Sequence, residues 1–353
     1  MAPRVDGASS RRRLWRLVRV GGLCLALLVL LAGAGLTALY IKFDRNISQV
    51  DIDGALGHDR PADSPNGSMD ILVLGSDSRA GTDGEYGRHS GARADTAMIV
   101  HLNEARDAAT VVSIPRDTLV ERPSCGGEPA RKRTMFNEAY SVGGPVCAVK
   151  TVEKLTGVRM DHYLEVDFEG FSRLVDTLGG VEVTTTQAIR DEDSKLDLAA
   201  GTHTLDGEQS LALVRTRKAL ADGSDLGRIR LQHSFVRALA RQVGGIGLFT
   251  DPRRLYDIAD TATRSVTTDS GLGSAADLAG LARTLKGIDA ESMTMLTMPV
   301  TFDPKDPNRV VAIERQATQV WSALRADRPV PGSATEGSAA QPQPSEREVI
   351  ARE

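Results

Sequence analysis

Several chemical signatures are missing from this chain of 353 residues. Its three cysteines form no C-x-x-C or C-x-x-H cluster, so a structural zinc site is not expected. No G-x-S-x-G and no G-x-x-x-x-G-K-[ST] occurs, which leaves a hydrolase elbow and a P-loop nucleotide site without support. The six histidines do not assemble into a catalytic set. Chemistry must therefore be sought among the charged residues.

Lysine is also scarce, because only eight lysines stand against 35 arginines. The net charge of −4 argues against a general nucleic-acid binder, and no nucleic-acid partner is expected. A GC-rich genome would explain the arginine excess, since it favours arginine codons. Arginines that hold phosphate or carboxylate groups through two hydrogen bonds would explain it equally well. The positions of the arginines decide between these two explanations.

The N-terminal region has the clearest signal in the chain. Six arginines precede an uncharged stretch, residues 20–41, which is long enough to cross a bilayer. Arginines before such a span place the preceding segment, residues 1–19, in the cytoplasm. A cleaved signal peptide ending near Ala32-Gly33-Ala34 is the alternative, but the apolar run is too long for a typical signal core. We expect a single-pass protein of the cell membrane whose later residues lie outside the cell.

Two cysteines, Cys125 and Cys147, lie in the part expected to be exported. An even pair of cysteines in an oxidising compartment favours a disulfide, and two free thiols are the alternative. Such a bridge would stabilise the fold by about 3 kcal/mol in the chain-entropy model.

Composition divides the rest of the chain into three parts. Residues 42–69 are polar and rich in Asp, Gly and Pro, which predicts an extracytoplasmic linker. Residues 326–353 are rich in Pro, Ser, Ala and Gln, which predicts a disordered tail. One domain, residues 70–325, remains between them.

That domain has the pattern of an α/β fold. Apolar, β-branched runs at 96–103 and 110–115 predict a hairpin. Apolar residues at helical spacing follow Cys147, and helices are also expected at 169–180 and from Arg228 onward. Because strands and helices interleave around a hairpin, we expect a mixed, partly antiparallel central sheet flanked by helices.

Acidic and arginine residues gather where these predicted strands and helices end. Ligands of open α/β sheets collect at strand ends, so four such clusters favour an anionic ligand. Arg215 and Arg217 alternate and would share one face of a strand, while Arg228 and Gln232 would share the first turn of a helix. Asp117 and Asp225 also have structural explanations, as a turn or helix cap. The clusters comprise Asp77 with Arg79, Arg88 and Arg93 with Asp95, Arg116 with Asp117, and Arg215, Arg217, Asp225, Arg228 and Gln232.

The two acids beside strands, Asp77 and Asp95, could converge on one hard cation. Mg²⁺ prefers one or two carboxylates together with phosphate oxygens, and Mn²⁺ could replace it. With the surrounding arginines holding negative charge, these residues would make a magnesium-dependent pyrophosphate site.

Several motifs occur in an order that resembles the LytR-CpsA-Psr family. They include "DILVLGSDSR", "GARADTAMIV", "VVSIPRDT", "FNEAYSVGG" and "DHYLEVDFEGFSRLVDTLGGVEV", and they cover residues 70–245 most closely. The resemblance implies an extracytoplasmic phosphotransferase. Such an enzyme moves a glycopolymer from a polyprenyl-pyrophosphate carrier onto a peptidoglycan acceptor.

The resemblance also implies roles for single residues. Asp77 and Asp95 match the acids that hold the metal, and Arg93, Asp95 and Arg116 match the catalytic motifs. Leu231 and His233 depart from the family, which often has Arg and a second Gln there. The residues expected to line the pyrophosphate are Arg79, Arg93, Arg116, Arg215, Arg217, Arg228 and Gln232.

Three rival functions follow from the same residues. A lipid-phosphate-binding scaffold would use the arginines without turnover, and a pyrophosphatase would release the polymer to water. A transcriptional regulator is the least supported, because about 19 cytoplasmic residues cannot hold a helix-turn-helix.

Overall fold

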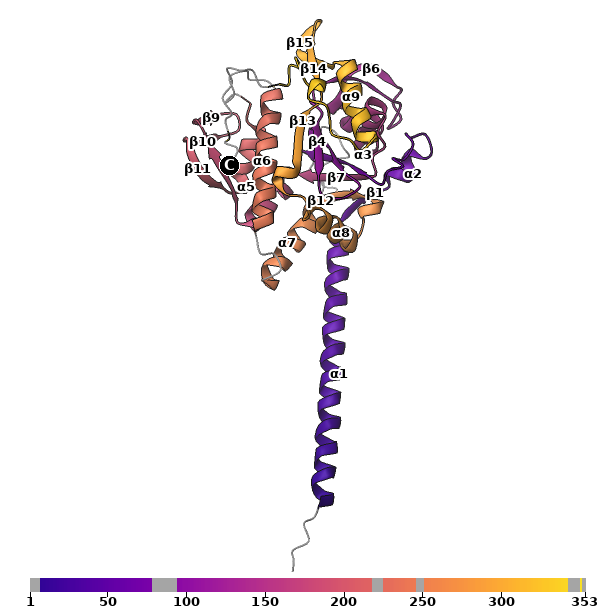
Figure 1. The fold of residues 1–353 in the computed structure, drawn as a ribbon, viewed down its shortest axis with the longest axis vertical. Helices are drawn as coiled ribbons and strands as arrows, with labels where there is room; N and C mark the ends of the chain where they lie inside the picture. The colour runs from indigo at the N-terminus through magenta and orange to yellow at the C-terminus, as the bar shows by residue number, and fades with distance from the viewer. Residues whose placement is uncertain (1–6, 78–93, 218–224, 246–250, 342–349, 351–353) are drawn as a thin grey trace, which may run out of the picture.

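The computed structural model describes residues 7–77, 94–217, 225–245, 251–341 and 350. A single long helix, α1 (Gly7–Asn46), projects from the domain as a rod (Figure 1). Its part from Gly21 to Asn46 is long and apolar enough to cross a membrane. The apolar helix that the sequence predicts is thus present, and it continues without a break to the base of the domain.

The centre of the domain is a seven-stranded mixed sheet, as the sequence predicts. Its strand order is β1-β12-β7-β2-β3-β4-β13, and it combines parallel and antiparallel neighbours. The predicted hairpin is confirmed as the antiparallel pair β3–β4. The strands are β1 (Ser48–Val50), β2 (Met69–Ser76), β3 (Ala94–Leu102), β4 (Ala109–Ser113), β7 (His162–Asp167), β12 (Val266–Asp269) and β13 (Met293–Thr297).

Alternate side chains of β2 enter different cores, as the two-residue period of a strand requires. Leu72 and Leu74 pack into the main core, which α3 (Phe136–Thr156) and α9 (Glu314–Arg325) help to form. Ile71 packs on the other face, near Leu281 of α8 (Ala275–Leu285). The sheet is therefore flanked by helices on both faces.

A second apolar core lies beside the sheet and includes Val175, Leu213 and Phe235. The helices around it are α4 (Phe168–Leu178), α5 (Gly207–Arg215) and α6 (Asp225–Gly245). Two small antiparallel sheets complete it, β8 (Val181–Thr185) with β11 (Gly201–Leu205) and β9 (Ile189–Asp191) with β10 (Leu196–Leu198). α6 therefore has one end at the charged cluster and a long face in this core.

Two hairpins lie at the end of the domain opposite to α1 (Figure 1). They are β5 (Leu119–Arg122) with β6 (Arg131–Met135), and β14 (Val300–Asp303) with β15 (Asp306–Ala312). The predicted disulfide is present and ties Cys125, in the β5–β6 connection, to Cys147 on α3. Gly126 allows this close approach, because a Cβ there would meet the carbonyl oxygen of Val142 at 2.5 Å.

The region expected to be a linker, residues 42–69, instead packs on the domain. β1 pairs with β12, and both Ile52 and Leu56 of α2 (Ile52–Leu56) are buried in the main core. Arg60 forms a buried ion pair of 2.6 Å with Glu153 of α3. The Asp, Gly and Pro content that predicts a linker belongs to turns between these short, docked elements.

The tail predicted to be disordered is also partly docked. Ala334 is fully buried, the amide of Ala339 donates to the carbonyl of Val300, and Ile350 bridges to Thr185. Scattered small apolar residues are enough for this docking, although the composition as a whole resembles that of disordered segments.

The C-terminal end of α1 is held by a clasp, which we define as its contacts with α7 (Pro252–Ser265) and α8. Lys42 forms an ion pair of 2.8 Å with Asp260, and Asn46 donates to Asp260 and Thr263 at 3.2 and 3.1 Å. Asp44 accepts the backbone N–H of Ala275 at the start of α8. α1 is thus fixed to the domain through side chains as well as through the backbone.

Candidate functional site

The two predicted metal-binding acids lie at the same end of neighbouring strands. Ser76 of β2 pairs with Ala94 of β3, and Asp77 follows Ser76 directly. The register shifts there, so Asp95 is an extra residue on β3, as in a β-bulge. Bulges re-aim side chains next to functional sites. This one places Asp95 at the sheet end, where Asp77 is exposed.

Arg116 is brought to Asp95 by the turn that follows β4. Its Nη1 donates a hydrogen bond to Asp95 Oδ1, and its Nε lies 3.4 Å from Asp225 Oδ1. The turn is held against α3, because the carbonyl of Arg116 accepts the backbone N–H of Asn137. The predicted partnership of Asp95 and Arg116 at one site is therefore a direct contact.

Arg228 approaches the same acids from the other side. This residue is only 4% exposed, and its Nη2 lies 2.6 Å from Asp225 Oδ1 and donates to the carbonyl of Asp95 at 2.8 Å. Burial lowers the pKa of Arg228, and the charge of Asp225 opposes that shift. Within the described ranges, the buried Nε atoms of Arg116 and Arg228 have no hydrogen-bond acceptor.

Gln232 lies one helical turn after Arg228, as its spacing predicts. Its amide donates to the hydroxyl of Thr96 and to the carbonyl of Val214, both at 3.0 Å. The first contact joins α6 to β3, and the second joins α6 to the last turn of α5. Gln232 thus fixes the helix end that supplies Arg228.

The outer edge of the cluster contains a residue that sequence reasoning did not identify. Arg309 of β15 lies 3.6 Å from Asp117, which is also 3.9 Å from the Nε of Arg116. Burial and then the neighbouring charge of Asp225 raise the pKa of Asp117. Arg309 lies almost 200 residues beyond Asp117 in the chain, so no local pattern could connect them.

Arg215 and Arg217 do not occupy one strand, and that prediction is wrong. Arg215 is the last residue of α5, a helix that starts with a capping box at Asp206 and Gln209. The guanidinium of Arg215 lies 4.9 Å from the ring centre of Phe168, and the backbone N–H of Arg217 donates to Asp191. Both arginines follow Val214, whose carbonyl accepts the amide of Gln232. Arg79, Arg88 and Arg93 lie outside the described residues.

The two departures from the family pattern have different structural outcomes. Leu231 is buried in the second core, so it does not bind charged groups. His233 is buried, and its Nε2 lies 2.8 Å from the hydroxyl of Ser113 at the end of β4. Burial, and then the nearby charge of Arg237, lower the pKa of His233 to about 4, so its imidazole is neutral at pH 7.

A buried acid supports the sheet end beneath the site. Glu165 of β7 is only 4% exposed and accepts hydrogen bonds from the hydroxyls of Tyr140 and Tyr163, each at 2.6 Å. It also accepts the hydroxyl of Ser76, the residue before Asp77. These contacts fix the end of β2. The alternating sequence pattern of β7 does not predict them.

The chemistry of the acids is compatible with a magnesium ion. Within the described ranges, no three His, Cys, Asp or Glu residues gather into a ready metal site. Mg²⁺ requires only one or two protein carboxylates when phosphate oxygens supply further ligands. Arg116 contacts one oxygen of Asp95, so its other oxygen suits such an ion, and Asp77 lies at the same end of the neighbouring strand.

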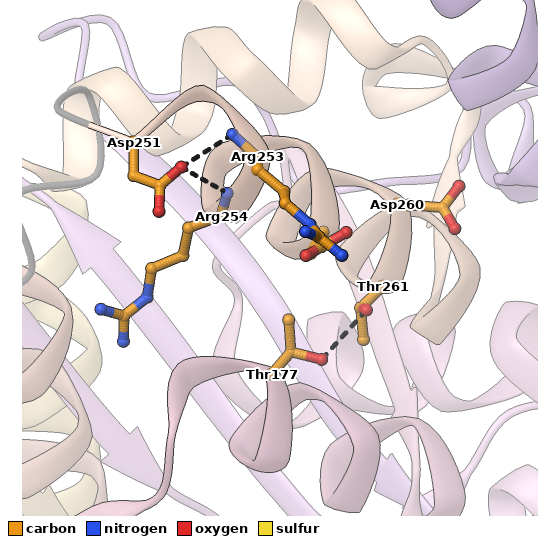
Figure 2. A pocket seen from close by; sticks show the side chains of 7 residues that line it. Thr177, Asp251, Arg253, Arg254, Asp260 and Thr261 are labelled. Carbon is orange, nitrogen blue, oxygen red and sulfur yellow. Dashed lines mark hydrogen bonds between the residues drawn. The ribbon is translucent and has the colours of Figure 1, made fainter.

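A polar hollow elsewhere on the domain has none of the predicted site residues. It lies between α4 and the start of α7, where Asp251 accepts the backbone N–H groups of Arg253 and Arg254 (Figure 2). Thr177 and Thr261 share a hydrogen bond across it. These contacts cap α7 and join it to α4, which gives the hollow a structural explanation.

The chain matches the LytR_cpsA_psr family over residues 39–326. It is 31% identical to the cell wall biosynthesis protein LcpA of Corynebacterium glutamicum over 78% of this chain, but it spans only 58% of the length of LcpA. The polyisoprenyl-teichoic acid–peptidoglycan teichoic acid transferase TagT of Bacillus subtilis is 30% identical over 83% of this chain and 90% of its own.

Solved structures share the fold as well. A LytR-Csp2A-Psr enzyme from Actinomyces oris superposes with a TM-score of 0.60 at 25% identity, over 79% of this chain and 95% of its own. TagT bound to LI-WTA superposes with a TM-score of 0.57 at 26% identity, over 80% and 98% of the two chains.

Proposed function

Because the chain belongs to the LytR_cpsA_psr family, we propose that it transfers a glycopolymer from a polyprenyl-pyrophosphate carrier onto peptidoglycan. The printed name of TagT supports this proposal, since it describes transfer of polyisoprenyl-linked teichoic acid to peptidoglycan. The long apolar α1 supports a location at the cell membrane. With residues 1–19 in the cytoplasm, as the arginines before the span suggest, the domain works outside the cell.

The contacts of Arg116 and Arg228 are the observation that carries this proposal. Two guanidinium groups meet at Asp95 and Asp225, and each keeps a buried Nε without a hydrogen-bond acceptor in the described part of the chain. A buried donor left unpaired costs free energy, which an anionic ligand would recover. A pyrophosphate offers acceptor oxygens for both arginines.

The reaction then needs one bond to form and one to break. A hydroxyl oxygen of peptidoglycan attacks the phosphorus next to the sugar, and the bond from that phosphorus to the oxygen of the lipid phosphate breaks. The polyprenyl phosphate leaves, and the glycopolymer stays joined to peptidoglycan through one phosphate. Arg116 and Arg228 stabilise the charge that develops on the phosphoryl oxygens, and we propose the same role for Arg79, Arg93, Arg215 and Arg217.

A divalent cation completes the proposed site. Asp77 and Asp95 would hold Mg²⁺, or Mn²⁺ in its place, and the ion would neutralise charge on the pyrophosphate oxygens.

The hydroxyl proton requires a base. Asp95 is the residue that we propose for this role, and the structure adds Asp117 as an alternative. Arg116 donates to one oxygen of Asp95, so that oxygen is less available as a base. The pKa of Asp117 is raised by burial, which makes it a stronger one.

The proposal is tested by transfer of polymer from a lipid-linked donor to peptidoglycan, using the full chain in lipid nanodiscs. Asp77→Ala and Arg116→Ala should each lower the transfer rate by at least about 100-fold, as loss of a group that stabilises the transition state does. Arg283→Ala, which removes an exposed arginine near the end of α8, is the control. Full transfer by both site variants would refute the site assignment.

The same assay separates the rival functions. A scaffold binds the donor without consuming it, and a pyrophosphatase yields free polymer in place of polymer joined to peptidoglycan.

A further inference from the structure

The two hairpins opposite to α1 carry exposed residues that have no role in the proposed reaction. We define the distal surface as Arg131 and Lys132 of β6, Phe302 of β14, and Lys305 in the turn between β14 and β15. Figure 1 shows β6, β14 and β15 at the end of the domain away from the membrane helix.

The side chains of the distal surface are exposed and have few internal partners. Phe302 is 50% exposed, and the other large exposed apolar residues described after α1 are aliphatic, namely Val243, Leu255 and Leu285. Lys132 and Lys305 have no ion pair in the described part of the chain, and Arg131 has only a distant one of 3.9 Å with Glu138. Phe302, Lys132 and Lys305 therefore leave an aromatic face and two ammonium groups available to a ligand.

Several contacts hold the two hairpins together as one surface. Arg133 of β6 forms an ion pair of 2.9 Å with Asp303, the neighbour of Phe302 on β14. The disulfide between Cys125 and Cys147 fixes the β5–β6 connection to α3. The surface is thus built before any ligand arrives.

The distal surface is continuous with the charged cluster. Val310 of β15 forms a bridge with Thr118, and its backbone N–H donates to the carbonyl of Asp117. Phe302 lies opposite Val310 in the hairpin. Two strand spacings of about 4.8 Å therefore put the backbone of Phe302 roughly 10 Å from Thr118, next to the turn of Arg116.

We propose that the distal surface binds the acceptor, a carboxylate-bearing glycan strand, and leads its hydroxyl to the cluster. The apolar face of a sugar ring packs on Phe302, because an aromatic ring offers a flat surface of low desolvation cost. The cations pair with carboxylates along the strand. This inference rests on the proposed function, in which peptidoglycan, a glycan with acidic side groups, is the acceptor.

Direct binding tests the inference without any need for turnover. The probes are soluble, uncrosslinked peptidoglycan fragments with free carboxylates, and the same fragments with those carboxylates amidated. The full chain in nanodiscs, without donor, should bind the free form more tightly. Phe302→Ala should raise the Kd by about tenfold, the effect of losing roughly 1.4 kcal/mol of stacking and burial.

A charge variant tests the second half of the inference. Lys132→Gln combined with Lys305→Gln should remove the difference between free and amidated fragments. The matched control, Lys154→Gln with Lys195→Gln, removes two exposed lysines elsewhere and should bind as the wild type does. The Kd for the lipid-linked donor and the unfolding midpoint should stay unchanged in every variant.

Three results would overturn the inference: no binding by the wild type, unchanged Kd in both surface variants, or an equal loss of donor affinity. The proposed function fails in a different way. Fragments that bind as expected but receive no polymer would refute transfer while the distal surface stands, whereas transfer with an unchanged acceptor KM in both surface variants would refute only the surface.

Discussion

At the scale of the residue, the site depends on Arg228, which is buried and whose Nε has no hydrogen-bond acceptor among the described residues. Arg228 is held by Asp225 and by the carbonyl of Asp95, so its guanidinium is oriented before a ligand binds. The spacing of Arg228 and Gln232 predicts their shared helix face correctly. The sequence could not identify Arg309, because its contact with Asp117 exists only after a distant hairpin folds back.

His233 allows a pH test of the same helix. Its folded-state pKa of about 4 lies below the usual value of 6.5, so the stability linked to the neutral ring is complete above pH 6.5. That stability falls as the pH drops from 6.5 toward 4, by about 3 kcal/mol in total for a shift of this size. His233→Gln keeps a neutral partner for Ser113 and should lose less stability over this window.

Urea unfolding of both proteins in detergent at pH 7 and pH 4.5 measures the difference. Burial alone would lower the pKa of His101, but Asp70 and Asp327 raise it, so its contribution to stability is present below pH 6.5 and is lost as the pH rises. This contribution is common to both proteins and cancels. Equal losses of unfolding free energy in wild type and His233→Gln would show that the buried ring does not cause the loss of stability at low pH.

At the scale of the element, short segments matter more than their composition suggests. The sequence predicts the β3–β4 hairpin, α4 and the later part of α3, because each has a clear apolar pattern, and both helices end at a glycine. It does not predict that β1 and α2 dock, because three or five residues are too few to show a period. The bulge at Asp95 is likewise invisible in the sequence, since it arises from the register with β2.

The clasp at the end of α1 should set the angle between the membrane helix and the domain. Asp260→Ala removes the shared partner of Lys42 and Asn46, so the helix should swing over a wider range. Distances between spin labels on α1 and on the sheet, measured by pulsed EPR in nanodiscs, should become more broadly distributed. Asp257→Ala, an exposed acid on the same helix, is the control, and equal widths in both variants would contradict this role.

At the scale of the whole molecule, the apolar helix α1 and the distal surface lie at opposite ends of the domain. α1 and the clasp are at one end, the distal surface is at the other, and α6 runs beside the sheet (Figure 1). The 21 residues of α6 correspond to roughly 30 Å of helix. The sequence predicts the sheet class and the membrane helix, but not the second core, whose two small sheets join segments without a continuous pattern.

The central claim is that one charged cluster moves the phosphate next to the sugar from lipid to peptidoglycan. The most direct measurement uses a lipid-linked donor labelled with ³²P at that phosphate and the full chain in nanodiscs. We predict that the label becomes fixed to peptidoglycan, and that Arg116→Ala abolishes this. Label that stays with the lipid, or appears on free polymer alone, would contradict the account.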